Sequence, residues 1–204
     1  SITGTTGVLT STAAYAMQAG TVSAILAGAS GMNKTTAGTV TLTGANTFTG
    51  TLSITAGTLR AEGNAEALGA GSVSINNATL ELIGDTSLNF GRDLALAGTG
   101  NIVVGRMNAG AAVTHTMGNF STCANPLNLT TSNINSGIVG LTLGSATING
   151  NNTFNAAVDT LITVGALSNG GTNRTMTKSG LGDLLFNAAV GTWTTTGNGL
   201  TINN

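Results

Sequence analysis

Apolar residues recur in this sequence at a constant long spacing that neither a helix nor a meander of strands would require. Three registers between residues 52 and 102 keep a period of about 21 residues, a length typical of repeat proteins. They are Leu52, Val73 and Leu94; Ile54, Ile75 and Leu96; and Leu59, Leu80 and Ile102. Such a period means that each coil of the chain returns to the same place and stacks apolar side chains on the coil before it. The spacing therefore predicts a solenoid.

Within each period, the local pattern is typical of short β-strands joined by corners. Val40 and Leu42 alternate with Thr, and Leu52 and Ile54 flank a Ser, which is the period of two of a strand with one buried face. Gly and Asn, which tolerate positive φ, lie between these runs. We therefore predict an all-β fold: a single right-handed parallel β-helix, or β-solenoid, with about 20–22 residues per coil.

One segment also carries a family resemblance. Residues 38–59, GTVTLTGANTFTGTLSITAGTL, closely resemble the autotransporter-associated β-strand repeat, with Phe48 where that repeat usually has Tyr. A degraded second copy is similar from Thr177 onward, TKSGLGDLLF. The resemblance implies a parallel β-helical segment of a large secreted or surface-displayed bacterial protein, and it implies no catalytic residues.

The period continues into the second half, which predicts one continuous solenoid over residues 1–204. Its later steps, each close to the same length, are Leu141 to Leu161, Leu143 to Val164 and Leu161 to Leu181. The pattern loosens between residues 106 and 126 and ends in the only proline, which cannot donate to a strand ladder. We expect an irregular coil or a protruding loop there and no domain boundary.

The start of the chain is not typical of a secretory leader, because it has neither an initiator Met nor a basic stretch. We therefore predict that the sequence is a fragment of a longer chain or is processed from one. The longest mildly apolar run, residues 13–32, is interrupted by polar residues and is rich in Ala and Gly. It does not meet the requirements of a membrane span.

Charged residues are unusually scarce, at 6% of the chain with a formal net charge of −1. Ordinary soluble domains contain about 25%. Nucleic acid is excluded as a partner, because its phosphates require clustered Lys and Arg. Weak charge repulsion and strand edges with almost no Lys or Pro favour association instead. We expect the partners to be other copies of the chain or its own continuation, with surface glycans as a second class.

Few residues qualify for catalysis or metal binding. A polysaccharide-cleaving β-helix requires paired carboxylates, and a separation close to one coil could bring Glu62 near Glu81 and Glu66 near Asp85. We interpret these acids as solvent-facing corner residues partly paired with arginines, which are Arg60 and Arg92. His115 is expected at the surface or at a corner, and Cys123 in the core. One Cys and one His cannot build a zinc site alone, so no catalytic, cofactor or metal site is predicted.

Asparagines at the corners are candidates for a different role. Identical amides at equivalent positions of successive coils can hydrogen bond to each other along the stack. The predicted ladder residues are Asn46, Asn64, Asn76 and Asn77.

These observations favour a structural module of a bacterial extracellular or surface fibre that self-assembles axially or laterally. The alternative is an adhesin or autotransporter passenger stalk that binds host or matrix glycans. Direct glycan binding would use exposed aromatic rings, for which the chain offers Trp193 and Tyr15. A third hypothesis is a polysaccharide-acting enzyme built on Glu62 and Glu81. Each hypothesis places the protein outside the cell or on its surface.

Overall fold

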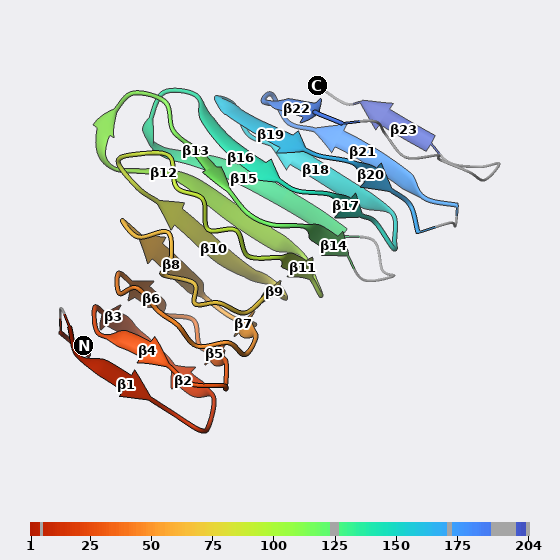
Figure 1. The fold of residues 1–204 in the computed structure, drawn as a ribbon. Coiled ribbons are helices and arrows are strands. Elements are labelled where there is room, and N and C mark those ends of the chain that lie inside the picture. The colour runs from red at the N-terminus through yellow and green to blue at the C-terminus, as the bar shows by residue number, and fades with distance from the viewer. Residues whose placement is uncertain (5, 123–126, 171–172, 189–198, 203–204) are drawn as a thin grey trace.

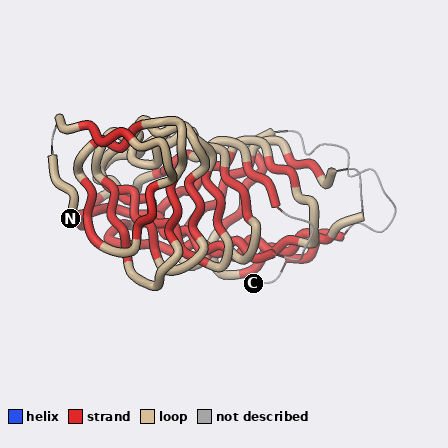
Figure 2. The backbone as a smooth tube through the Cα atoms, turned by 90° about the horizontal axis from the view of Figure 1, so that it is seen from below, coloured by secondary structure: helices blue, strands red, loops and turns tan. Residues whose placement is uncertain are grey.

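The computed structural model describes residues 1–4, 6–122, 127–170, 173–188 and 199–202 (Figure 1). These residues form strands and turns without a helix, and every strand pairing among them is parallel. The chain winds through about 8 turns, which lie side by side along the axis in Figure 2. The predicted all-β parallel solenoid is therefore confirmed, while its right-handed winding stays a prediction.

Two long sheets run along the solenoid. Within the described residues, sheet 1 contains, in spatial order, β23 (Gly199–Ile202), β21 (Thr175–Ser179), β18 (Asn152–Ala156), β15 (Leu127–Ser136), β12 (Gly100–Gly110), β10 (Ala78–Ile83), β8 (Thr58–Glu62), β6 (Thr39–Leu42) and β3 (Gly20–Val22). Sheet 2 contains β2 (Tyr15–Met17), β5 (Met32–Lys34), β7 (Leu52–Ile54), β9 (Val73–Ile75), β11 (Leu94–Leu96), β14 (Phe120–Thr122), β17 (Ala146–Thr147) and β20 (Leu167–Ser168).

Two shorter sheets form the third side at opposite parts of the stack. In the described part of the chain, sheet 3 contains β13 (Thr114–Thr116), β16 (Val139–Leu143), β19 (Thr160–Val164) and β22 (Asp183–Phe186). Sheet 4 pairs β1 (Val8–Thr10) with β4 (Ile25–Ala27) near the N-terminus. Between these two sheets, the third side is made of turns.

Apolar side chains form columns in the narrow coils, which we define as residues 32–104. Along sheet 2, Leu52 pairs with Val73 and Val73 with Leu94, and all three side chains are buried. The other two predicted registers also lie in columns, namely Ile54, Ile75 and Leu96 in sheet 2, and Leu59, Leu80 and Ile102 in sheet 1. Neighbouring strands are about 4.8 Å apart, so each side chain packs directly on the next coil.

A glycine permits the close approach of coils at the corner before β8. Gly57 has a φ of 66°, a left-handed conformation that residues with a side chain rarely adopt. A Cβ atom there would lie 2.4 Å from the carbonyl oxygen of Thr36 in the preceding coil. The Ala-Gly-Thr-Leu part of the motif thus has a steric reason: only Gly lets the chain turn and stack at this point.

The wide coils, residues 105–186, follow a longer spacing at first. Leu94 pairs with Phe120, and Ile102 pairs with Thr131, so both steps are longer than the one from Leu80 to Ile102. The additional residues go into two places. They extend β12 beyond the end of β10 and they supply β13, the first strand of sheet 3.

Two of the three spacings predicted for the second half are wrong. Leu143 does pair with Val164, but Leu161 pairs with Gly140 and Asp183 instead of Leu141 and Leu181. A shift of one residue moves a side chain to the opposite face of a strand. Ile162 therefore points into the core in place of Leu161, and Leu181 lies 75% exposed in the turn before β22.

Candidate functional site

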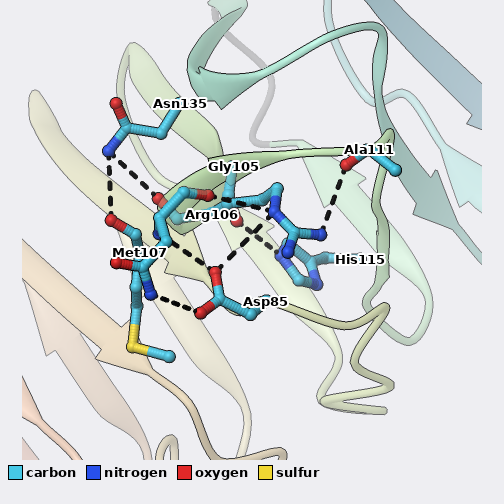
Figure 3. Close-up of polar contacts among 8 residues, drawn as sticks. Asp85, Gly105, Arg106, Met107, Ala111, His115 and Asn135 are labelled. Carbon is cyan, nitrogen blue, oxygen red and sulfur yellow. Dashed lines mark hydrogen bonds and ion pairs between the residues drawn. The ribbon is translucent and has the colours of Figure 1, made fainter.

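A ridge formed by residues 106–110 projects where β12 continues past β10 (Figure 3). The Asp85 carboxylate accepts hydrogen bonds from the backbone N–H of Asn108 at 3.0 Å and from its Nδ2 at 2.7 Å. Arg106 Nε lies 3.7 Å from Asp85 Oδ1 and donates to the carbonyl oxygen of Asn108. On the other side, Asn135 Nδ2 donates to the carbonyl oxygens of Arg106 and Met107. The ridge is thus held from the coils on both sides.

The ridge has a distinct electrostatic anchor and an apolar tip. Hydrogen bonds from the backbone and side chain of Asn108, together with the Arg106 charge, hold the pKa of Asp85 below its usual value. An ionised Asp85 therefore occupies the N–H of Asn108, a backbone donor of β12 beyond the end of β10. Met107 is 41% exposed, and it is the large apolar side chain that the ridge presents to solvent.

His115 lies at the base of the ridge, and the expectation that it is a surface or corner residue is wrong. It is fully buried, because β13 turns it into the core on the inner face of sheet 3. Its Nδ1 accepts the backbone N–H of Leu88 at 3.1 Å, and its Nε2 lies 3.0 Å from the carbonyl oxygen of Gly105. Both contacts fit a neutral ring with the proton on Nε2. Burial lowers the pKa of His115, and the edge of the ring meets Phe90.

The four acidic residues considered as catalytic candidates each pair with an arginine. Arg60 Nε lies 2.5 Å from Glu81 Oε2, and Arg60 Nη1 lies 3.4 Å from Glu62 Oε2. Both carboxylates raise the pKa of Arg60, Glu81 more strongly. Arg92 Nη2 pairs with Glu66 at 2.5 Å. The structure therefore brings Glu62 and Glu81 together around one cation, an arrangement that engages both carboxylates in ion pairs.

A polar groove crosses three successive narrow coils at the corner leading into sheet 1. Residues 57–58, 77–79, 99 and 101 line it, and its volume is about 460 Å³. Asn77 takes a left-handed φ of 55°, and its Oδ1 accepts the backbone N–H of Thr99. Thr58, Thr79 and Asn101 face outward in register, one from each coil. Sequence reasoning missed this groove because it needs the alignment of three coils, which differ slightly in length.

The four predicted ladder residues lie at corners, where they bridge coils in a different way. Asn46 is buried, its Oδ1 accepts the N–H of Leu26, and its Nδ2 donates to the carbonyl oxygen of Ala67. Asn64 Nδ2 donates to Thr43, one coil back. Among the contacts that the structure describes for these four, the amide-to-amide bond joins sequence neighbours, Asn77 and Asn76. The side-chain bonds that Asn46, Asn64 and Asn77 make to other coils run to backbone groups.

The aromatic and cysteine predictions have different outcomes. Tyr15 is 7% exposed, and its hydroxyl donates toward the carbonyl oxygens of Leu9 and Ala27, so it is not an exposed ring for glycans. Trp193 and Cys123 lie outside the described residues. Among the described residues, no helix has the length and apolarity to span a membrane. Within the same residues, no group of three or more His, Cys, Asp and Glu is placed to hold a metal ion.

The comparison with known proteins agrees with the repeat geometry. Residues 32–61, which contain β5, β6, β7 and most of β8, match the family model described as Passenger-associated-transport-repeat. This segment is similar to a passenger-associated transport repeat. The resemblance noted in the sequence is therefore confirmed. The repeat builds more than one narrow coil, including the Gly57 corner and the buried Asn46.

A curated relative extends the similarity beyond the repeat. The adhesin BmaC autotransporter of Brucella suis biovar 1 (strain 1330) is 35% identical over 108 residues, which cover 53% of this chain. That stretch is 3% of the relative, so the chain spans only a small part of its length. No solved structure matches the chain.

Proposed function

We propose that this chain is a stalk segment of an adhesin-type autotransporter passenger, secreted and displayed on a bacterial surface. The observation that carries the proposal is the repeat itself, whose apolar columns continue in register into the neighbouring coils. In a solenoid, each coil contacts only its neighbours, so length is added without a new core. Such a body suits a long spacer that holds a binding region away from the cell.

The proposal contains no catalytic step, because the candidate carboxylates are engaged by arginines and the buried His115 contacts backbone groups. The matched relative is named as an adhesin autotransporter, which supports display on a surface more than assembly into a filament. In this proposal, the partners at the two ends of the stack are further coils of a longer passenger.

Deleting one coil in the full-length protein tests the proposal. Removing residues 53–73 joins Leu52 to Ser74, which takes the place of its register partner Ser53. Every column then remains aligned, so we expect surface labelling of an epitope tag beside the exposed Ile138 to stay within about twofold of wild type. The control removes residues 63–73, which breaks the register of the columns, and it should greatly reduce labelling of intact cells.

Two outcomes would contradict the stalk. One is a one-coil deletion that abolishes display as completely as the control deletion. The other is a wild-type protein that is found only in the intracellular fraction and shows no surface labelling of intact cells.

A further inference from the structure

The polar groove offers a binding site of definite chemistry. We infer that it binds a neutral, extended glycan that runs along the solenoid axis with about one sugar ring per coil. The inference depends on the proposed function only for its setting, a surface-displayed chain that meets glycans outside the cell. Its physical basis is the arrangement of groups in the groove.

Hydrogen-bonding groups repeat in the groove at the spacing of the coils. Thr58 pairs with Thr79, and Thr79 with Asn101, so their outward side chains succeed one another at intervals of about 4.8 Å. Sugar rings in an extended glycan follow one another at a similar spacing. Each ring would therefore meet a hydroxyl or amide group, and in a β-1,4-linked chain, whose neighbouring rings are rotated by about half a turn, every second ring would meet it with the same edge.

Several of these groups remain available to a ligand. The hydroxyls of Thr58 and Thr99 make no hydrogen bond within the described residues. Thr79 Oγ1 only accepts, from Asn101 Nδ2 at 3.4 Å, so its own O–H is free to donate. The Oδ1 of Asn101 also has no partner in that part of the chain. The groove thus offers free donors and acceptors, both of which the hydroxyls of a sugar can use.

The surroundings favour an uncharged ligand over an anionic one. None of the lining residues is ionisable. On the same outer face, two residues along β8 and β10, Arg60 and Glu81 pair with each other, and Glu62 also pairs with Arg60. Behind the Gly57 corner, the ammonium of Lys34 is buried and engaged by the carbonyl oxygens of Thr36 and Ala56, so it does not face the groove. The Arg60 cluster has two carboxylates for one cation. It would therefore repel a uronic acid or a sulfated sugar and leave a neutral sugar unaffected.

The shape of the groove fits a chain lying on a flat floor. Gly57 has no side chain and Ala78 is buried, so the backbone can approach the ligand closely. A volume of about 460 Å³ lies within the usual range for small-ligand sites. The lining has no aromatic ring, so we expect millimolar affinity for a short oligosaccharide. Affinity on a cell surface would rise through many copies acting together.

The test is an NMR titration of the full chain with three probes: cellohexaose, chitohexaose and the anionic hexamer of galacturonic acid. We expect a neutral hexasaccharide to shift backbone amide signals of residues 57–58, 77–79 and 99–101. The galacturonic acid hexamer should bind at least threefold more weakly. Spectra of each variant also report whether it is folded.

Matched variants locate the site. The double variant Thr79→Val and Asn101→Ala removes two hydrogen-bonding groups, so we expect binding to weaken about tenfold or more. Thr163→Val is the control, because Thr163 is an outward threonine of β19 in sheet 3, away from the groove. It should bind like the wild type.

Three results would overturn the inference. They are no shift with either neutral hexasaccharide at millimolar concentrations, equal binding by the double variant, or tighter binding of the anionic hexamer. The coil-deletion experiment on cells is independent of this titration. Display without glycan binding would refute the groove alone, and glycan binding without display would refute the stalk alone.

Discussion

The narrow and wide coils close the third side of the solenoid by different means. In the narrow coils the described residues form no strand on this side. Backbone bonds such as that from the Ala70 N–H to the Phe48 carbonyl join neighbouring coils there, and the buried Asn46 adds bonds to the N–H of Leu26 and the carbonyl of Ala67. In the wide coils the backbone does this itself, because β13, β16, β19 and β22 pair in sheet 3. On this side of the narrow coils, a side-chain amide therefore satisfies backbone groups that strand pairing does not.

A lysine side chain binds backbone carbonyl oxygens at one corner in each of the two regions. Lys34 lies fully buried in the core of the narrow coils, where its ammonium donates to the carbonyl oxygens of Thr36 and Ala56, and burial lowers its pKa. Lys178 donates likewise to the carbonyl oxygen two residues on, that of Gly180. The first corner leads from sheet 2 to sheet 1, and the second from sheet 1 to sheet 3. A lysine therefore forms a similar corner at different places in the stack.

The largest effect is expected from Asn46→Leu, which tests whether an amide replaces strand pairing in the narrow coils. The change leaves two buried backbone groups without partners, at about 1–3 kcal/mol each. Urea unfolding of the full chain should show a loss of about 2–5 kcal/mol. The control is Asn64→Ala, since Asn64 is only partly buried, and it should cost about 1 kcal/mol or less. Equal effects of the two variants would show that the buried amide of Asn46 has no special role in holding the third side.

A gain in stability is expected from Asn152→Leu in the wide coils. Asn152 is 3% exposed on the inner face of β18, and within the described residues neither its Oδ1 nor its Nδ2 has a hydrogen-bond partner. Its pairing partner Met176 is apolar. Removing an unsatisfied buried amide should stabilise the chain by about 1–3 kcal/mol in urea unfolding. A loss of stability would mean that the amide has a role that the described contacts do not include.

A pH dependence is expected to originate in the wide coils, which contain the only histidine. Burial lowers the pKa of His115, so the unfolded chain binds a proton at higher pH than the folded chain does. Stability should be complete above about pH 6.5 and should fall as the pH decreases below it, by at most about 1.4 kcal/mol per unit. In unfolding measured between pH 7.5 and 5.5, His115→Phe should remove this slope. An unchanged slope would assign it to other groups.

The smallest effect is expected where the two regions meet, at the ridge. Asp85→Asn replaces the carboxylate that holds the N–H of Asn108, so hydrogen exchange of that amide should become several-fold faster while unfolding of the whole chain changes little. In the wild type, lowering the pH through the depressed pKa of Asp85 should have the same local effect. Glu66→Gln is the control. It removes a carboxylate that pairs with the side chain of Arg92, so it should leave the exchange of the Asn108 amide unaffected.

The narrow coils could be predicted closely because their columns repeat with almost no change in length. Leu52, Val73 and Leu94 keep one spacing, so the sequence indicates their contact directly. The wide coils could not be predicted closely, because their insertions change the spacing between paired residues. If the period is continued at a constant length, it predicts that Leu161 pairs with Leu181. In the structure, Leu161 pairs with Asp183. The burial of His115 was missed for a different reason. A lone His has no equivalent residue in the next coil, so the periodicity does not indicate which face of its strand it occupies.

The sequence by itself determined the parallel solenoid, the apolar columns of residues 52–102 and the resemblance to the repeat at residues 38–59, because these depend on side chains that recur with the coil. Only the tertiary structure decided how the third side closes, which face of β13 is buried and that the groove residues align across three coils. The physical reason is that a parallel coil pairs with the next one along the stack, so an insertion in one coil changes the sequence spacing of every pair that spans it.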